Sequence, residues 1–412
     1  MFGGAIVVAL LHAVDDAFLG RQPGVGLGQH FFAAVIALGA GLTAIVAFPR
    51  LRPGLRALLA AVFGILALAN GAQHVFHIAT NELAASDLTG VAATAAGVVL
   101  LGLAVLIPFR HRGEGSATRG RRWTTRLVAV VGSVVIAFMF LIPVGVGIAW
   151  THKYRERIGV PPPGFDPVTF PAADGLRLSG WYSPSRNGAA VILVHGGGGD
   201  RLGPRPHAEL LAAHGYGALL YDARGRGESE GSPNAAGWQW DRDVEGALSF
   251  LAARSDVDPD RIGAIGLSTG ADVVLEAAAE QRDLRAVVAE GAAVRSFDDY
   301  RNAGLDVLAP TSWVLMAAVR VLSGAAPGEP LKELVREISP RPLLVIAAGK
   351  GSMGPGGGEY GLGRMYAEAA SEPVEFWGLP EGRHTAAIRE RPEEYERRVV
   401  TFFDRALLEG DT

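Results

Sequence analysis

The chain has 412 residues, of which 49% are apolar and 19% are charged. A typical soluble protein carries about 25% charged residues, so this deficit, with a mean hydropathy of +0.24, argues against intrinsic disorder and against a purely soluble protein. The absence of cysteine excludes disulfides, thiolate metal sites and cysteine nucleophiles, and a net charge of −4 gives a nucleic-acid partner no electrostatic support.

The charges are unevenly distributed along the chain. Residues 1–126 contain ten Arg, no Lys and five acidic residues, whereas the remainder contains 28 basic and 37 acidic residues. This asymmetry predicts two parts in different surroundings. We expect a membrane domain over residues 1–150, a proline-rich linker over residues 151–164 and a second domain over residues 165–408.

Four long stretches of the first part carry almost no charged side chains. A helix of about 20 apolar residues crosses the hydrocarbon core of a bilayer, and a helix satisfies its own backbone hydrogen bonds there. We therefore predict an α-helical transmembrane bundle of about four spans, in a multi-pass protein of the cell membrane. The four stretches are Gly28–Phe48, Leu55–Ile78, Leu88–Phe109 and Leu127–Trp150.

The first residues, Met1–Gly20, form a weaker pattern. Their apolar run Ala5–Leu11 is short, no basic residue precedes it, and Asp15 and Asp16 follow it. A cleaved signal peptide begins with a basic region, so this segment does not match one. We expect a fifth helix that lies at the membrane interface or packs against the bundle.

The distribution of arginine predicts the orientation of the spans. The links Pro49–Arg56 and Arg110–Arg126 carry three and six Arg, whereas the link Ala79–Asp87 carries no basic residue. Positively charged links stay in the cytoplasm, so the second domain is predicted outside it. The stretch His152–Arg157, with three basic residues and one acid, favours the opposite orientation but is outweighed by the six Arg.

One stripe of polar residues lies within the predicted membrane domain. Asn70, Gln73, His74 and His77 recur at helical spacing and therefore share one helix face. Polar groups at membrane depth are costly and tend to face the bundle interior. A metal or cofactor site is one interpretation, because the two histidines are one turn apart. We favour the other interpretation, in which the stripe makes interhelical hydrogen bonds or lies near the outer interface.

In the second domain, short apolar runs rich in β-branched residues alternate with helical stretches. This alternation indicates a mostly parallel sheet covered by helices on both faces. The predicted strands are Ala190–Val194, Ala218–Tyr221, Ile262–Ile265, Ala286–Ala289, Leu343–Ala347 and Val374–Leu379. The predicted helices include His207–His214, Trp240–Arg254 and Ala271–Gln281.

A G-x-S-x-G pentapeptide, Gly266–Gly270, joins the strand Ile262–Ile265 to the next helix. In this context small residues let strand and helix approach closely, and the tight turn exposes the hydroxyl of Ser268. The N-terminus of the helix also favours negative charge that develops there. A serine that only caps a helix is the alternative, and the two motifs described next favour a nucleophile.

A glycine run, Gly196–Gly199, follows the strand Ala190–Val194 and His195. Acyl transfer needs backbone N–H groups aimed at the oxyanion, and we assign these donors to Gly197 and to Thr269, the residue after the nucleophile. A phosphate-binding loop is the alternative, but the run lacks both the Lys-Ser/Thr pair and the spaced glycines of nucleotide motifs. We expect His195 to position this loop rather than to act as a base.

The base that takes the proton of the serine is predicted after the last strand. A serine is a weak nucleophile until a base removes its proton, and histidine is the base matched to neutral pH. Of the ten histidines, His384 alone lies downstream of Ser268, in a loop after Val374–Leu379. We therefore predict that His384 is the catalytic base.

Residues 165–408 resemble the α/β-hydrolase superfamily, in which nucleophile, acid and histidine follow one another in this order. The resemblance rests on the pentapeptide around Ser268 and on Tyr221–Ser229, which is similar to the D-x-R-G-x-G-x-S segment after the fourth strand of superfamily members. It covers about 60% of the chain and is closest to bacterial serine hydrolases of the esterase or aminopeptidase-like kind. It implies an α/β-hydrolase domain that uses no metal and no organic cofactor.

The acid that would orient His384 departs from the superfamily pattern, in which it follows the strand before the histidine loop. Here Leu343–Ala347 is followed by a glycine-rich stretch without a carboxylate at that place, and the first acid downstream is Glu359. We take Glu359 as the acid because a glycine-rich loop can fold back. Asp298 and Asp299, after the preceding strand, are the alternatives, since some superfamily members place their acid there.

Together these motifs predict a membrane-anchored serine hydrolase that cleaves an ester, thioester or amide through an acyl-enzyme. The alternative is a membrane protein whose hydrolase-like domain senses or scaffolds without turnover. A transport role has little support, because the spans contain few polar residues and no charged pair. A cap is expected at about residues 300–337, where Trp313, Leu315 and Met316 either favour a lipid-like or other small acyl substrate or form the core of the cap.

Overall fold

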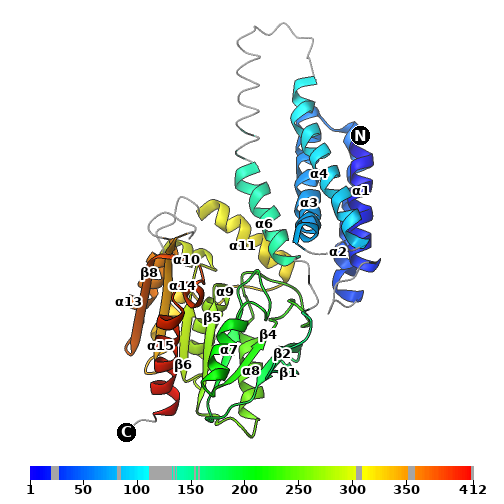
Figure 1. The fold of residues 1–412 in the computed structure, drawn as a ribbon. Helices are drawn as coiled ribbons and strands as arrows, with labels where there is room; N and C mark the ends of the chain where they lie inside the picture. The colour runs from blue at the N-terminus through cyan, green and yellow to red at the C-terminus, as the bar shows by residue number, and fades with distance from the viewer. Residues whose placement is uncertain are drawn as a thin grey trace. The chain divides into compact units, whose positions relative to one another are not determined.

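The computed structural model describes residues 1–19, 27–80, 85–110, 132, 135, 137–152, 155, 158–302, 309–350 and 358–409. The chain divides into two compact units, which can be followed by residue number in Figure 1. The first unit comprises Met1–Tyr154 with Pro310–Leu322, and the second comprises Arg155–Ala309 with Ser323–Thr412.

The second unit is built on one eight-stranded sheet with the order β1-β2-β4-β3-β5-β6-β7-β8. The pairs β1–β2 and β2–β4 are antiparallel, and all other neighbours are parallel. The predicted mostly parallel sheet is therefore confirmed. The strands are β1 (Asp166–Pro171), β2 (Arg177–Ser183), β3 (Ala190–Val194), β4 (Gly217–Tyr221), β5 (Ile262–Leu267), β6 (Ala286–Glu290), β7 (Leu343–Lys350) and β8 (Val374–Arg383).

The central strands are buried on both faces, which explains their continuous apolar sequences. Within β3, Ile192 and Val194 belong to one hydrophobic cluster, whereas Val191 and Leu193 belong to another. This alternation follows from the two-residue period of a strand, whose side chains point to opposite faces of the sheet. Helices must therefore cover both faces.

Helices from the connections supply the apolar residues that cover each face. Residues of α8, α9 and α13 join the first cluster, and residues of α7 and α15 join the second. The helices of this unit are α7 (Arg205–Ala213), α8 (Asp241–Ala252), α9 (Thr269–Glu280), α10 (Phe297–Asn302), α12 (Leu331–Leu334), α13 (Gly358–Ala369), α14 (Ala387–Glu390) and α15 (Pro392–Phe403). Figure 1 shows them packed around the sheet.

The parallel strands place their carboxyl ends along one edge of the sheet. His195 directly follows β3, Ser268 directly follows β5, and His384 directly follows β8. The last residue of β6 is Glu290. Ligands of open α/β sheets bind at this edge, so residues more than 180 positions apart in sequence can meet there.

The first unit is made of apolar helices. Many of their large apolar side chains are exposed, among them Ile36, Leu42, Val98 and Val105. Such outward-facing apolar residues are typical of helices that contact lipid. The helices are α1 (Phe2–Val14), continued by a π-helical turn (Asp15–Leu19), α2 (Leu27–Ala47), α3 (Pro53–Thr80), α4 (Ala85–Arg110), α6 (Ile142–Thr151) and α11 (Ala309–Ser323).

Among the described residues, three helices are long and apolar enough to cross a membrane: Phe2–Leu19, Pro53–Gly71 and Asp87–Ile107. The last two correspond to the second and third spans predicted from the sequence. The first predicted span coincides with α2, of which Ala34–Arg50 counts as a shorter apolar helix, and the fourth appears as the shorter apolar helix Phe138–Thr151. The predicted count of four therefore differs from the three candidates found, and part of the fourth span, residues 127–131, 133, 134 and 136, lies outside the described residues.

Within the segment Met1–Gly20, α1 packs against neighbouring helices, as one of the two expectations had it, and Phe2–Leu19 is in addition a candidate span. The reason lies in where its two acidic residues are placed. Asp15 and Asp16 belong to the π-helical turn at the end of the helix, and Asp15 Oδ2 accepts a hydrogen bond of 2.6 Å from Thr89 Oγ1. At least one of the two charges is therefore paired with a neighbouring helix.

The polar stripe on α3 takes part in a buried network between helices. His74 Nδ1 lies 3.0 Å from Asp87 Oδ1 of α4, and both side chains are almost fully buried. His12 of α1 lies 3.0 Å from Thr89 Oγ1, and its ring meets that of His74 edge to face. The interpretation as interhelical hydrogen bonds is therefore confirmed for His74.

The other three residues of the stripe are Asn70, Gln73 and His77. The side chains of Gln73 and His77 lie outside those described, so the one-turn pair of His74 and His77 stays untested. Asn70 is partly buried on α3. Within the described residues, no group of three or more His, Asp or Glu side chains is arranged to hold a metal ion.

Helix α11 lies in the sequence between β6 and β7, yet its residues Pro310–Leu322 belong to the first unit. It packs closely on α6, since a Cβ added at Gly147 would lie 3.0 Å from the Cβ of Ala318 and 3.7 Å from Leu315. The structure therefore divides the expected cap. Helices α10 and α12 stay with the sheet, whereas α11 joins the apolar helices.

Candidate active site

Ser268 occupies a sharp turn between β5 and α9. Its backbone has φ 55° and ψ −124°, a combination that non-glycine residues rarely adopt. The N–H of Ser268 donates a hydrogen bond of 2.8 Å to the carbonyl oxygen of Glu290 at the end of β6. This turn has the form of the nucleophile elbow predicted from the G-x-S-x-G sequence.

The two glycines of the pentapeptide are required by close backbone contacts. A Cβ added at Gly266 would lie 2.1 Å from the carbonyl oxygen of Gly270. A Cβ added at Gly270 would lie 2.3 Å from the carbonyl oxygen of Val194, at the end of the neighbouring strand β3. Because both clashes involve backbone atoms, no side-chain rotation could relieve them.

His384 and Glu359 complete a chain of hydrogen bonds that starts at Ser268. The Nε2 atom of His384 lies 2.9 Å from Ser268 Oγ, and its Nδ1 atom lies 2.5 Å from Glu359 Oε2. The Glu359 carboxylate is 5% exposed, and its Oε1 atom accepts a second hydrogen bond of 2.8 Å from the N–H of Ala348. The structure thus brings together all three predicted residues.

The carboxylate of Glu359 also changes the proton affinity of the imidazole. Its hydrogen bond to His384 raises the pKa of the histidine above the usual 6.5, against the opposing effect of partial burial. The negative charges of Glu359, Glu290 and Asp272 act in the same direction. Burial raises the pKa of the Asp272 carboxyl itself to about 7.

Glu359 lies in the first turn of α13 rather than in a loop directly after β7. Whether the glycine-rich stretch folds back, as expected from the sequence, falls on residues 351–357, outside the described part of the chain. The position of Glu359 is nevertheless defined, because its carboxylate bonds both to His384 and to the N–H of Ala348 in β7.

The alternative acids do not reach the histidine. Asp299 accepts hydrogen bonds from the Ser296 hydroxyl at 2.7 Å and from the N–H of Leu331 at 2.9 Å. Asp298 is 59% exposed and lies 3.3 Å from Arg301. Asp299 therefore joins α10 to the start of α12, while Asp298 lies at the surface.

His195 holds the glycine loop against the next strand connection. Its Nε2 atom accepts a hydrogen bond of 3.0 Å from the N–H of Ala223, and its Nδ1 atom donates one of 2.8 Å to the carbonyl oxygen of Gly196. Because one ring nitrogen accepts and the other donates, the ring is neutral. Burial lowers its pKa, which agrees with this assignment. The expected positioning role therefore follows from these contacts.

The loop after β4, which bonds to His195, is itself fixed by buried ion pairs. Arg201 lies 2.7 Å from Asp222, and Arg224 lies 2.7 Å from Asp243, with both carboxylates fully buried. Burial raises the pKa of the Asp243 carboxyl to about 6 despite its arginine partner. Removing one member of such a pair would leave a buried charge unpaired, so the D-x-R-G segment is a rigid support for the glycine loop.

Gly197 and Thr269, the predicted oxyanion donors, lie against each other. A Cβ added at Gly197 would lie 2.6 Å from Thr269 Oγ1 and 2.1 Å from the carbonyl oxygen of Ala235. Thr269 begins α9, where the first N–H groups of a helix have no partner within it. A Cβ added at the preceding Gly196 would lie 3.2 Å from the Cβ of Ser268, so the glycine loop borders the serine.

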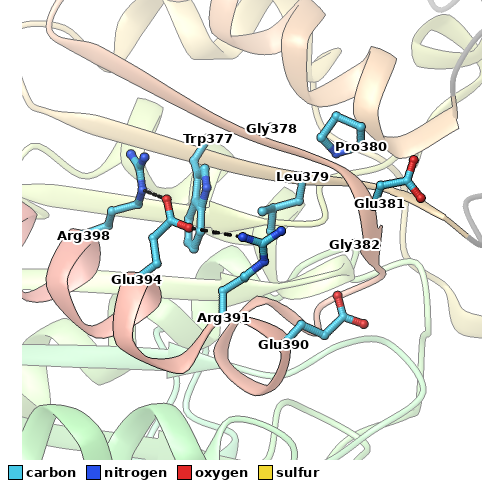
Figure 2. Close-up of a pocket in the computed structure, with 10 residues that line it drawn as sticks. All are labelled: Trp377, Gly378, Leu379, Pro380, Glu381, Gly382, Glu390, Arg391, Glu394 and Arg398. Atoms are coloured by element: carbon cyan, nitrogen blue, oxygen red, sulfur yellow. Dashed lines mark hydrogen bonds and ion pairs between the residues drawn. The ribbon is translucent and has the colours of Figure 1, made fainter.

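A surface hollow of about 420 Å³ lies beside the strand that leads to His384 (Figure 2). Its lining includes Trp377, which is covered by the guanidinium of Arg398, and Glu394, which pairs with Arg398 at 2.9 Å. None of Ser268, His384 or Glu359 lines this hollow. It therefore does not belong to the candidate active site.

Two residues at this site are absent from the sequence-based predictions. Gly291 has φ 78°, and a Cβ there would lie 2.9 Å from Cε1 of His384, so only glycine leaves room for the imidazole. Glu290 precedes it, is 2% exposed and accepts a hydrogen bond of 3.1 Å from the N–H of Ala387. The available signal is an acid–glycine pair that directly follows an apolar strand.

Comparison with known proteins agrees with this geometry. The profile of the X-Pro dipeptidyl-peptidase (S15) family matches residues 152–339. An uncharacterised protein of Mycobacterium tuberculosis, MT2364, is 32% identical over 281 residues, which cover 62% of this chain and 84% of the relative. The uncharacterised protein YfhR of Escherichia coli is 28% identical over 284 residues, which cover 66% of this chain and 93% of the relative.

Solved structures show the same fold. The Pyrococcus furiosus esterase Pf2001 superposes with a TM-score of 0.50 at 23% identity, over 61% of this chain and 97% of the esterase. At this identity the likeness establishes the fold alone. With the family profile, the relatives and the elbow geometry, it leads to one conclusion. The chain is a hydrolase of the α/β-hydrolase superfamily, to which its C-terminal part belongs, and it carries an apolar helical N-terminal part.

Proposed function

We propose that this protein is a membrane-anchored serine hydrolase that cleaves an ester, thioester or amide bond through an acyl-enzyme. The observation that carries the proposal is the unbroken chain of hydrogen bonds from Ser268 Oγ through His384 to Glu359. This arrangement gives a hydroxyl, a base and a buried carboxylate the relative positions that a serine nucleophile requires.

In the proposed mechanism, Ser268 Oγ attacks the carbonyl carbon of the substrate while its proton passes to His384 Nε2. The resulting imidazolium is stabilised by Glu359, which accepts the hydrogen bond from Nδ1 and keeps the ring in the productive tautomer. His384 then donates the proton to the leaving oxygen, sulfur or nitrogen, which leaves an acyl group on Ser268. A water molecule, deprotonated by His384, releases the acid and restores the serine.

The negative charge that develops on the substrate oxygen needs donors already in place. We assign this role to the N–H groups of Gly197 and Thr269, which belong to two segments in close contact beside Ser268. The support given to the glycine loop by His195 favours this assignment, because preorganised donors need no rearrangement during the reaction.

A fluorophosphonate probe, which reacts with activated serines, tests the enzyme proposal directly. We expect covalent labelling of the wild-type protein, no labelling of Ser268→Ala, and normal labelling of Ser371→Ala, which replaces an exposed serine elsewhere in the same unit. Absence of labelling in the wild-type protein would contradict the proposal and favour a sensing or scaffolding role for the domain.

The membrane anchor is proposed from the three apolar helices that are long enough to span a bilayer. We expect the full-length protein to stay in the membrane fraction during alkaline carbonate extraction and to need detergent for release. Recovery in the carbonate supernatant would contradict the anchor while leaving the enzyme proposal intact.

For the orientation, we propose that the hydrolase part lies outside the cytoplasm. The supporting observation is the excess of arginine in residues 49–56 and 110–126 over residues 79–87. Alkaline phosphatase fused after Thr412 is expected to be active and green fluorescent protein fused there to be dark. The reverse pair of results would mean that the hydrolase part faces the cytosol.

The proposed substrate is a small or lipid-like molecule with an acyl group. The proposed membrane anchor favours a substrate with a hydrophobic acyl chain, because such molecules concentrate in the lipid bilayer. Turnover of p-nitrophenyl esters of increasing chain length is expected to rise from acetate to longer chains. A steady fall with chain length would contradict this preference.

A further inference from the structure

The feature that carries a further inference is the buried acid Glu290, which contacts the elbow on one side and the histidine loop on the other. Its carbonyl oxygen accepts the N–H of Ser268 at 2.8 Å. Its carboxylate oxygen Oε1 accepts the N–H of Ala387 at 3.1 Å, three residues beyond His384. One residue thus connects the segments that carry the nucleophile and the base.

These contacts involve only one of the two oxygens of the Glu290 carboxylate. Its second oxygen, Oε2, has no hydrogen-bond partner among the described residues and lies 3.8 Å from Nε2 of His207 on α7. The hydroxyl of Tyr395 on α15 also lacks a partner in this part of the chain, and its ring meets that of His207 edge to face. A buried acid with so few partners is costly to maintain, which suggests a use beyond packing.

We propose that Glu290 is a positioning residue for the Ser268–His384 pair, which holds both segments in register and favours the positively charged imidazolium that forms during proton transfer. This inference rests on the proposed function and adds a second carboxylate to the predicted acid, Glu359. The two acids differ in how they act, because Glu359 bonds to the ring itself, whereas Glu290 bonds to the backbone that carries it.

Three acidic groups raise the pKa of the imidazole, and the test must distinguish the effect of Glu290 from that of the other two. Glu359 approaches from α13, Asp272 from the first turn of α9, and Glu290 from the end of β6. All three raise the pKa of His384, and the hydrogen bond that the imidazole donates to Glu359 is the largest contribution. The acid limb of a pH profile reports how much each group raises the pKa of His384. Loss of packing alone would not shift this limb.

The decisive variant is Glu290→Gln, which keeps the shape and an oxygen that can accept the N–H of Ala387 but removes the charge. We measure the rate of fluorophosphonate labelling against pH in the full-length protein in detergent. The acid limb is expected to move to lower pH, because one of the negative charges that raise the pKa of His384 is removed, and the plateau rate is expected to fall several-fold. An unchanged limb would overturn the inference.

Two further variants separate charge from position. Glu290→Asp keeps the charge but withdraws the carboxylate from Ala387, so the limb is expected to stay in place while the plateau rate falls several-fold. If Glu290→Gln does not fold, this variant decides, and a wild-type plateau rate in Glu290→Asp would overturn the inference. The matched control is Glu381→Gln, an exposed acid three residues before His384, for which a wild-type profile is expected.

Failure of this inference can be told apart from failure of the proposed function. If the wild-type protein is not labelled, then the serine-hydrolase proposal and the role of Glu290 both fail. If the wild-type protein is labelled and Glu290→Gln has the same pH profile, only the role of Glu290 fails.

Discussion

The three side chains of the candidate site are held by the fold to very different degrees. Ser268 is fixed by its backbone in the turn, and Glu359 is buried with a hydrogen bond to each oxygen. The side chain of His384 is 43% exposed and is held mainly by its two bonded neighbours. The imidazole is therefore the group whose orientation depends most on its partners.

This dependence predicts the effect of removing the charge of the acid. Glu359→Gln is expected to lower kcat by about 10³–10⁴-fold, because a neutral amide cannot hold the productive tautomer or stabilise the imidazolium. The fold should persist, as the amide can still accept the N–H of Ala348. Steady-state kinetics and circular dichroism measure the two effects. Wild-type turnover in Glu359→Gln, with a loss in Asp298→Asn or Asp299→Asn, would assign the acid to the preceding strand connection.

The raised pKa of His384 predicts the pH dependence of the wild-type enzyme. The base must be neutral to accept the serine proton, so kcat/KM is expected to fall on acidification with an apparent pKa above 6.5. In Glu359→Gln the same limb should move to lower pH. A wild-type limb below pH 6.5 in a steady-state pH profile would contradict the proposed pairing.

The raised pKa of His384 also makes the stability of the folded protein depend on pH. The folded-state pKa of His384 lies above its unfolded value, so the protonated form stabilises the folded protein. This contribution is fully present below the unfolded pKa and is lost as the pH rises through the folded pKa. The site is therefore most active in the protonation state in which this stabilisation is absent.

At the scale of elements, a strand can be predicted from the sequence when its apolar residues form a clear run or alternation. Strand β3 is buried on both faces, so its sequence is a continuous apolar run before glycines, and its bounds are predicted without error. Strand β1 is exposed at four of its six residues and begins Asp-Pro, so it offers no such run and was not predicted. A strand that is buried on both faces is therefore easier to predict from the sequence than a strand that is largely exposed.

Site residues show the same contrast. Ser268 follows a predicted strand within the G-x-S-x-G pentapeptide, and His384 is the histidine downstream of it, so both could be assigned from the sequence. Glu359 was chosen only as the first acid downstream of the strand, with Asp298 and Asp299 left open, because it lies in the first turn of α13 beyond a glycine-rich stretch. Glu290 and Gly291 offer only an acid–glycine pair after an apolar strand as a signal, because their roles depend on contacts with residues more than 90 positions away.

The close contact between β3 and α9 predicts the cost of a single methyl group. Gly270→Ala is expected to destabilise the protein by about 2–4 kcal/mol, because the Cβ would meet the backbone of Val194 and no rotamer avoids it. Gly203→Ala, where the nearest atom is 3.5 Å away, serves as the control and should unfold like the wild type. Thermal unfolding followed by circular dichroism distinguishes the two variants. Equal unfolding temperatures would show that the elbow tolerates more than the geometry allows.

At the scale of the whole molecule, apolar composition identifies a part made of apolar helices but fixes the number of candidate membrane spans less well. The run Ala5–Leu11 is too short to predict a span, and Phe2–Leu19 becomes a candidate because the helix continues through Asp15. Hydrogen bonds such as that between Thr89 and Asp15 cannot be read from local composition. The number of candidate spans therefore depends on pairing between polar groups that are distant in the sequence, which composition does not reveal.

The assignment of α11 to the first unit means that the chain passes between the two units three times, near residues 154, 309 and 322. One cut at Arg155 would therefore retain the whole second unit together with α11 of the first unit. It would leave α11 without α6, the helix that faces Ala318 and Val319. We expect a truncated protein beginning at Arg155 to aggregate in size-exclusion chromatography without detergent.

Replacing residues 310–322 in that truncated protein by a glycine–serine linker of equal length is expected to restore a soluble monomer that the fluorophosphonate probe still labels. A monomeric product without the linker would contradict this expectation. The two units are therefore not separated by a single cut in the chain. Recombination that joins the sheet to a different membrane anchor would have to carry α11 and its partner helix together.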